Sequence, residues 1–185
     1  MFSKGIRKIV AAGILALLPG CSVRRYAINQ IGNAIASGGS TYEQDDDVEL
    51  VGSALPFGLK LIESLLEESP KHAGLLLAAT SGFTQYAYVY VDQSAEQTLG
   101  EDVERAGQMQ ARARRLYGRA RGYGLRALDR RYPGIASELD KEPKAALART
   151  QRRDVPVLYW TAAAYGLAIS ASRNEIGRAS CRERV

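Results

Sequence analysis

The segment from Ser69 to Val91 constrains the fold most, because it is apolar on nearly every face of the helix that it predicts. Pro70 stands at its start, where proline favours the first turn of a helix. A helix that is apolar all round must be covered by neighbours on several sides, and small side chains allow those neighbours to approach closely: Ala78, Ala79, Ser81 and Gly82. Polar side chains in the same helix require partners or a cavity if they are buried: Thr80, Ser81, Thr84 and Gln85.

The remaining segments have helical periodicity, and none has the alternation that is typical of strands. Helices are predicted at 26–36, 48–54, 56–68, 103–132, 135–149 and 156–172, with loops at 37–41 and 92–102. Segment 156–167 repeats the pattern of 70–83, with a proline start, leucines and an alanine-rich middle, and the helix at 156–172 is predicted to be a second buried one. Such pairs are typical of helical repeats that stack into a curved array with a concave binding face. The predicted fold class is all-α, with antiparallel helix pairs in a degenerate tetratricopeptide-like repeat array.

The N-terminus has the pattern of a bacterial lipoprotein signal. A basic start precedes an apolar stretch that is too short to span a bilayer. The string Leu18-Pro19-Gly20-Cys21 resembles a lipobox, in which the Cys21 thiol takes a lipid and becomes the new N-terminus. The alternative is a buried cysteine in a plain membrane anchor. We expect residues 1–20 to be a signal peptide and Cys21 to be the lipidation site.

The C-terminal segment 175–185 resembles the translation of a sequencing-adapter sequence, so we expect a helical domain over 21–174 and a native sequence that continues past it. Most of the formal charge of +5 lies in the signal region and this tail. A strongly basic domain would indicate nucleic-acid binding. The region between the two is nearly neutral, and we expect no nucleic-acid partner.

The sequence contains no pattern that is typical of a catalytic or metal site. His72 is the only histidine and Cys181 lies in the tail, so neither a zinc site nor a Cys–His dyad is predicted. The acidic run at 45–49 lacks the spacing of a calcium loop and favours a helix start instead. We expect no cofactor, no metal and no enzymatic activity.

Two sets of residues are candidates for binding. An apolar ligand pocket needs aromatic side chains with a few polar groups, and four residues on the two apolar helices fit that need: Gln85, Tyr86, Trp160 and Tyr165. Core packing is the alternative for each of them. The predicted helix 103–132 carries an arginine row opposite its apolar face: Arg112, Arg115, Arg119, Arg126 and Arg130. Such a row is usually a solvated face; an acidic partner or anionic lipid headgroups are the alternatives.

Three blocks of the sequence, 45–66, 74–87 and 155–163, resemble the T component of TRAP transporters, the TatT family. The resemblance covers roughly 21–174 and implies an all-helical fold with hidden tetratricopeptide-like repeats. It also implies a homotrimer when the chain is full length, and a complex with a periplasmic TRAP substrate-binding protein, the P component.

On this resemblance we expect a lipid-anchored periplasmic accessory component of TRAP-type solute uptake, which docks a substrate-binding protein and frames a ligand passage. Ser22 after the lipidated cysteine, where aspartate favours the inner membrane in enteric bacteria, favours the outer membrane. The alternative is a general helical-repeat scaffold lipoprotein of the cell envelope.

Overall fold

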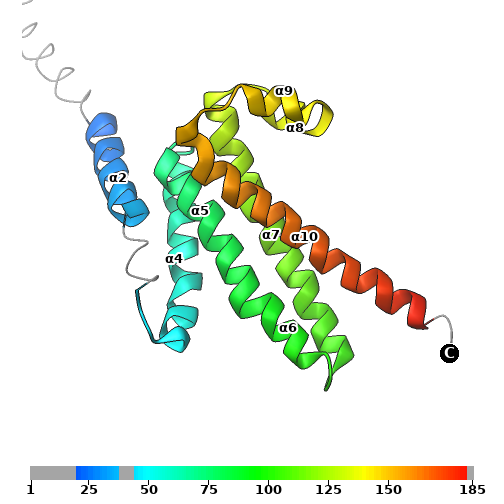
Figure 1. Cartoon of the computed structure of the whole chain (residues 1–185). Coiled ribbons are helices and arrows are strands. Elements are labelled where there is room, and N and C mark those ends of the chain that lie inside the picture. Colours follow the sequence, from blue (N-terminus) through cyan, green and yellow to red (C-terminus); the bar gives the residue numbers. More distant parts are fainter. Residues whose placement is uncertain (1–19, 38–43, 183–185) are drawn as a thin grey trace, which may run out of the picture.

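The computed structural model describes residues 20–37 and 44–182 (Figure 1). Of these, 20–22, 24, 25, 37 and 173–182 are described by their backbone only, and the first 19 residues of the predicted signal peptide lie outside the description. The elements are α2 (Gly20–Ser37), α4 (Val48–Glu68), α5 (Ala73–Tyr86), a π-helical turn (Ala87–Asp92), α6 (Gln93–Thr98), α7 (Val103–Arg131), α8 (Ile135–Lys141), α9 (Pro143–Ala148), a 3₁₀ turn (Arg152–Asp154) and α10 (Val155–Arg182). No strand occurs in these two ranges, so the all-α fold class is confirmed. The tetratricopeptide-like repeat stays a prediction.

Helix α5 lies at the centre of the bundle, as its pattern predicts. It contacts α2, α4, α7 and α10, and Figure 1 shows it between α4 and the crossed pair α7 and α10. Leu75, Leu76 and Ala79 are fully buried in the main core. An all-round apolar helix has no face that favours water, so neighbours must cover most of it.

Both ends of α5 differ from the prediction. The helix begins at Ala73, because the His72 ring accepts a hydrogen bond from the Leu75 N–H at 3.1 Å and caps the helix, whereas Pro70 lies in the preceding turn. At the other end the chain stays helical through the π-helical turn and α6. The predicted loop 92–102 is therefore wrong for its first seven residues. The physical reason is burial: Ala95 is fully buried and Asp92 nearly so, which anchors this segment against α7.

Helix α4 is a single helix, although the sequence predicts a break at Pro56. An internal proline loses one backbone hydrogen bond. Buried apolar side chains occur on both sides of the proline, Val51 before it and Leu59, Ile62 and Leu66 after it, so packing outweighs that loss. The predicted acidic cap is confirmed at Asp47, whose carboxylate accepts a hydrogen bond from the Leu50 N–H at 2.9 Å.

Helices α7 and α10 cross in contact with α5 at Gly124. A Cβ at this position would lie 2.0 Å from Thr161 Oγ1 of α10 and 3.1 Å from Thr80 Cγ2 of α5. No side chain larger than hydrogen fits there without movement of a neighbour. The predicted long helix 103–132 is confirmed as α7, and Gly124 belongs to its predicted apolar face.

Helix α10 is buried on one side only. Thr161, Ala164 and Ala171 are buried. Its other side exposes large apolar side chains: Val155, Tyr159, Tyr165 and Ile169. The prediction of a second helix buried all round is therefore wrong for the described part of the chain. Residues 152–172 are long and apolar enough to cross a membrane by length and composition alone, a property that core helices of soluble proteins share.

The predicted helix 135–149 is divided into α8 and α9, because Pro143 begins a new helix. The segment that contains α8 and α9 leads into α10 through the 3₁₀ turn, which ends at Asp154. Asp154 is 3% exposed. The Asp154 carboxylate accepts hydrogen bonds from Arg131, from the Tyr132 hydroxyl at 2.6 Å and from the Gln151 N–H at 2.9 Å. These contacts join the end of α7 to the start of α10.

Candidate functional site

An apolar groove of about 680 Å³ runs along the face of α5 that α7 does not cover. Its floor is α5, one wall is α4, and α2 contributes the end of its apolar stripe, Ile35 and Ala36. Trp160 of α10 lies at the opposite edge. The groove therefore joins three consecutive helices to α10, which is far from them in the sequence.

The floor of the groove includes small residues at helical spacing: Gly74, Ala78 and Gly82 are four apart, and Ser81 follows Ala78 by three. Residues with this spacing lie on one face of a helix. Gly82 also sets the width of the groove, because a Cβ there would lie 2.8 Å from Leu59 Cδ2 of α4. The absence of that atom lets α4 approach α5 and form the wall.

Most polar side chains of α5 are satisfied by the helix itself. Thr80 and Thr84 are buried, and their hydroxyls donate to the carbonyls of Leu76 and Thr80, each at 2.7 Å. Ser81 faces the groove but also donates to its own helix, to the Leu77 carbonyl at 3.1 Å. Gln85 differs, since its half-buried side chain lines the groove and hydrogen-bonds to no other residue in the described ranges. Its amide can both donate to and accept from a ligand.

The structure brings two of the four predicted binding residues together. Gln85 and Trp160 line the same groove, and Trp160 packs edge-on against Tyr159, with ring centroids 5.1 Å apart. Tyr86 does not line it; this side chain is buried, and its hydroxyl accepts a hydrogen bond from Arg112 of α7 at 3.2 Å. Tyr165 is half exposed, outside the groove.

The lipidation site predicted at Cys21 belongs to α2, but its side chain lies outside the described residues.

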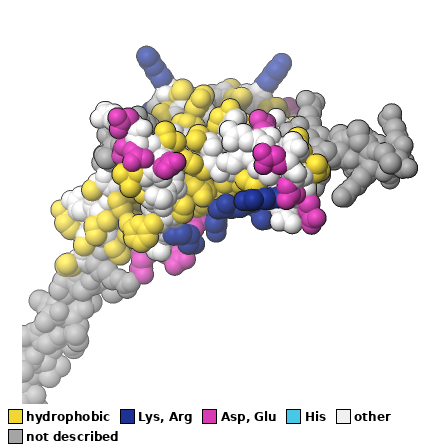
Figure 2. Space-filling view, turned by 90° about the horizontal axis from the view of Figure 1, so that it is seen from below, with side chains coloured by type: hydrophobic (Ala, Val, Ile, Leu, Met, Phe, Trp, Pro, Cys, Tyr) yellow, Lys and Arg dark blue, Asp and Glu magenta, His cyan; other side chains and the backbone are white. Residues whose placement is uncertain are grey.

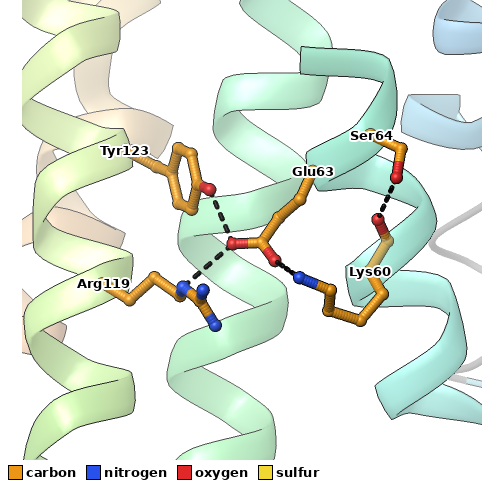
Figure 3. A network of polar contacts seen from close by, with 5 residues as sticks. All are labelled: Lys60, Glu63, Ser64, Arg119 and Tyr123. Atoms are coloured by element: carbon orange, nitrogen blue, oxygen red, sulfur yellow. Dashed lines mark hydrogen bonds and ion pairs between the residues drawn. The ribbon is translucent and has the colours of Figure 1, made fainter. Parts of the chain in front are cut away.

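A polar cluster joins α4 to α7 at Glu63 (Figure 3). The Glu63 side chain is buried, with 9% of its surface exposed. It pairs with Arg119 Nε at 2.9 Å and Lys60 Nζ at 2.8 Å, and it accepts a hydrogen bond from the Tyr123 hydroxyl at 2.7 Å. Sequence reasoning did not single out this residue. The sequence feature that could have indicated it is a carboxylate within the apolar stripe of 59–66, in a chain that also contains an arginine-rich helix.

The contacts of Glu63 decide its charge. Burial by itself raises the pKa of the Glu63 carboxyl, but the hydrogen bonds from Lys60 and Tyr123 and the positive charge of Arg119 outweigh it, so that this pKa lies below its usual range. Burial and the hydrogen bond to Glu63 raise the pKa of the Tyr123 hydroxyl to about 12. At neutral pH the cluster therefore consists of a carboxylate, two cations and a neutral tyrosine, and it joins the two helices electrostatically.

No group of three or more His, Cys, Asp or Glu side chains that could hold a metal ion lies among the described residues. The fold and the groove together define an all-α protein with an apolar groove between packed helices.

Comparison with known families identifies the family of this all-α protein. The family model for the TRAP transporter T-component matches residues 44–184, and the chain belongs to this family. The match includes most of segment 175–185, for which the sequence predicts an adapter origin. A similar protein is an uncharacterized protein of Treponema pallidum (strain Nichols), which is 30% identical over 167 residues, covering 80% of this chain and 52% of the relative. The chain thus spans about half the length of this curated relative.

Proposed function

We propose that the protein is a lipid-anchored periplasmic accessory component of TRAP-type solute uptake, which docks a substrate-binding protein and frames a ligand passage. Membership in the T-component family supports the assignment to TRAP transport. The single observation that supports a ligand passage is the apolar groove along α5, which both Gln85 and Trp160 line.

The groove has the size and lining of a small-molecule site. Its volume of about 680 Å³ falls within the range of ligand pockets, which are mostly apolar with a few placed polar groups. The walls are aliphatic and aromatic, and the Gln85 amide is the polar group left available. We therefore assign the passage to a ligand that has an apolar body and one hydrogen-bonding end.

The anchor and the assembly complete the proposal. Lipidation of Cys21 would hold the chain at the membrane through α2, and the Ser22 that follows favours the outer membrane. The family supports a homotrimer for the full-length protein and the P component as the docked partner. These assignments rest on the sequence and on family membership.

Trp160 provides a direct test of the groove, because it is the only tryptophan in the chain. The apolar dye N-phenyl-1-naphthylamine accepts energy from tryptophan, so its binding in the groove should quench Trp160 emission. Ala78→Phe places a ring on the groove floor and should abolish the quenching, whereas Ala145→Phe, at an exposed position of α9, should leave it unchanged. Equal quenching in the Ala78→Phe variant would rule out the groove as the binding site.

The partner is tested by co-purification. The full-length native protein should recover a TRAP substrate-binding protein from periplasmic extract. Recovery of envelope-assembly factors in its place would favour the alternative, a general scaffold lipoprotein. Cys21→Ala should abolish palmitate labelling; labelling that persists would reject the lipidation site.

A further inference from the structure

Three arginines of α7, each separated from the next by two helical turns, lie against aromatic rings. The guanidinium carbon of Arg112 is 5.8 Å from the centroid of the Tyr86 ring. The corresponding distances are 5.2 Å from Arg119 to Phe83 and 5.3 Å from Arg126 to Tyr123. We call these three residues the stacked arginines.

This arrangement differs from that of an ordinary solvated face. Arginines that serve only solubility extend into water, whereas a guanidinium held over a ring gains a cation–π contact. Stacking also restricts the plane of the guanidinium, and a restricted fork of N–H donors loses less entropy when it binds a carboxylate. Phe83 and Tyr86 of α5 are buried, and the half-buried Tyr123 of α7 stacks on Phe83, so packed side chains hold the arginines in place.

The stacked arginines retain binding capacity. Arg119 is paired with Glu63. Arg112 and Arg126 have no carboxylate partner in the described part of the chain; Arg112 donates a hydrogen bond to the Tyr86 hydroxyl, and Arg126 donates one to the Pro70 carbonyl. Both side chains are exposed. With a rise of 1.5 Å per residue, neighbouring members of the row are about 10 Å apart along the helix.

The surrounding charges favour a protein partner over a lipid surface. In the view of Figure 2, basic side chains gather in a row with acidic side chains on both sides. Exposed acidic residues occur at the starts of α4 and α7, at 45–49 and 101–104. A flat anionic bilayer would meet these acidic groups with the same charge, whereas a protein surface can match alternating signs.

We propose that the stacked arginines form a docking surface for a carboxylate-bearing face of a partner protein. The inference rests on the proposed function only for the identity of that partner, the substrate-binding protein. Carboxylates about 10 Å apart, as on residues seven apart along a helix, would match Arg112, Arg119 and Arg126.

The test measures binding of poly-L-glutamate by calorimetry at low salt, with four forms of the full chain. The pair Arg112→Gln and Arg126→Gln should weaken binding about tenfold, because it removes the two stacked guanidinium groups that have no carboxylate partner in the described part of the chain. The matched control is the exposed pair Arg152→Gln and Arg153→Gln, which should change binding less than about twofold. The pair Arg112→Lys and Arg126→Lys keeps the charge but loses the planar fork, and an intermediate loss is expected.

Two results would overturn the inference. The first is binding by the Arg112→Gln/Arg126→Gln form that equals wild type, or a loss no greater than that of the control. The second is a loss seen only with vesicles of phosphatidylglycerol, which would assign the row to the membrane.

A parallel arm with the TRAP substrate-binding protein separates this inference from the proposed function. If the substrate-binding protein binds wild type but not the Arg112→Gln/Arg126→Gln form, the result supports both the docking surface and the proposed function. Binding that the variant retains overturns the docking surface and leaves the proposed function standing. If wild type binds poly-L-glutamate through the stacked arginines but not the substrate-binding protein, the proposed function fails and the docking surface stands.

Discussion

The contact of three helices at Gly124 allows a quantitative test of how the bundle is packed. Replacement by alanine adds one methyl group at a point where Thr161 Oγ1 lies only 2.0 Å away and Thr80 Cγ2 only 3.1 Å away. Thr161 cannot turn aside freely, because it is buried and its hydroxyl donates to the Val157 carbonyl at 2.5 Å. The methyl group must therefore separate α7 from α10 or break that hydrogen bond.

The expected cost follows from two opposing effects. Alanine is favoured over glycine inside a helix by about 1 kcal/mol. Overpacking of a core costs about 1 to 3 kcal/mol, and a contact this short, against a β-branched side chain with few rotamers, belongs at the upper end. The net destabilisation for Gly124→Ala is thus about 2 kcal/mol.

Gly118 is the matched control, since it lies in the same helix and a Cβ there would meet nothing within 4 Å. Gly118→Ala should gain about 1 kcal/mol from helix propensity alone.

Thermal unfolding followed by circular dichroism measures both variants. At about 2 to 4 °C per kcal/mol for a chain of this size, Gly124→Ala should lower the midpoint by roughly 4 to 8 °C, and Gly118→Ala should raise it by roughly 2 to 4 °C. The double variant Gly124→Ala/Thr161→Ala should recover stability relative to the sum of the single variants, because it removes the clashing oxygen. A Gly124→Ala variant that is stabilised as much as Gly118→Ala would refute the packing described for these helices.

Three further predictions concern the buried carboxylates. Glu63→Gln should destabilise the protein by about 1 to 2 kcal/mol in urea unfolding, less than the 3 to 5 kcal/mol of a fully buried pair, because Arg119 is half exposed and can reach water; no measurable change would show that the cluster does not join α4 to α7. Acid should destabilise wild type. The folded pKa values of Glu63 and Asp154 are both lowered, because hydrogen bonds and nearby cations outweigh the effect of burial. Their contribution to the free energy of unfolding is therefore present above the unfolded pKa, near 4.5 for Glu63, and is lost as the pH falls below it. A pH series of unfolding midpoints should show a smaller acid loss in Glu63→Gln than in wild type, and identical curves would contradict this. Asp154→Ala should cost roughly 3 kcal/mol, because Arg131 and Tyr132 lose their buried acceptor; hydrogen exchange should become faster at 133–154, and uniform exchange across the chain would argue against a local role.

The sequence of single segments determined the central position of α5, the boundaries of α7 and the family resemblance. An apolar surface on every side of the α5 segment requires several covering neighbours whatever their order, so its central position follows from local sequence. The boundaries of α7 follow from Asp102, which caps its start, and from the Pro133-Gly134 pair that ends it. The resemblance of the blocks at 45–66, 74–87 and 155–163 likewise indicated the family that the comparison confirmed.

Other features depend on distances between helices, which no local pattern encodes. Pro56 remains inside α4, since packing of the stripe on α5 outweighs one lost hydrogen bond. Residues 93–98 are helical because the segment is anchored against α7, partly through the hydrogen bond from Tyr117 to Asp92 at 2.9 Å.

In the groove, too, the sequence determined the candidate residues and the tertiary structure determined which of them lie together. The sequence identified Gln85 and Trp160 as candidates, but only the packing of α10 beside α5 and α4 places them together and leaves Tyr86 and Tyr165 elsewhere. Threonine side chains on α5 were equally plausible lining groups until the structure showed their hydroxyls bonded to their own helix. Local chemistry decides which side chains are able to bind a ligand, whereas the approach of one helix to another decides which of them share a surface.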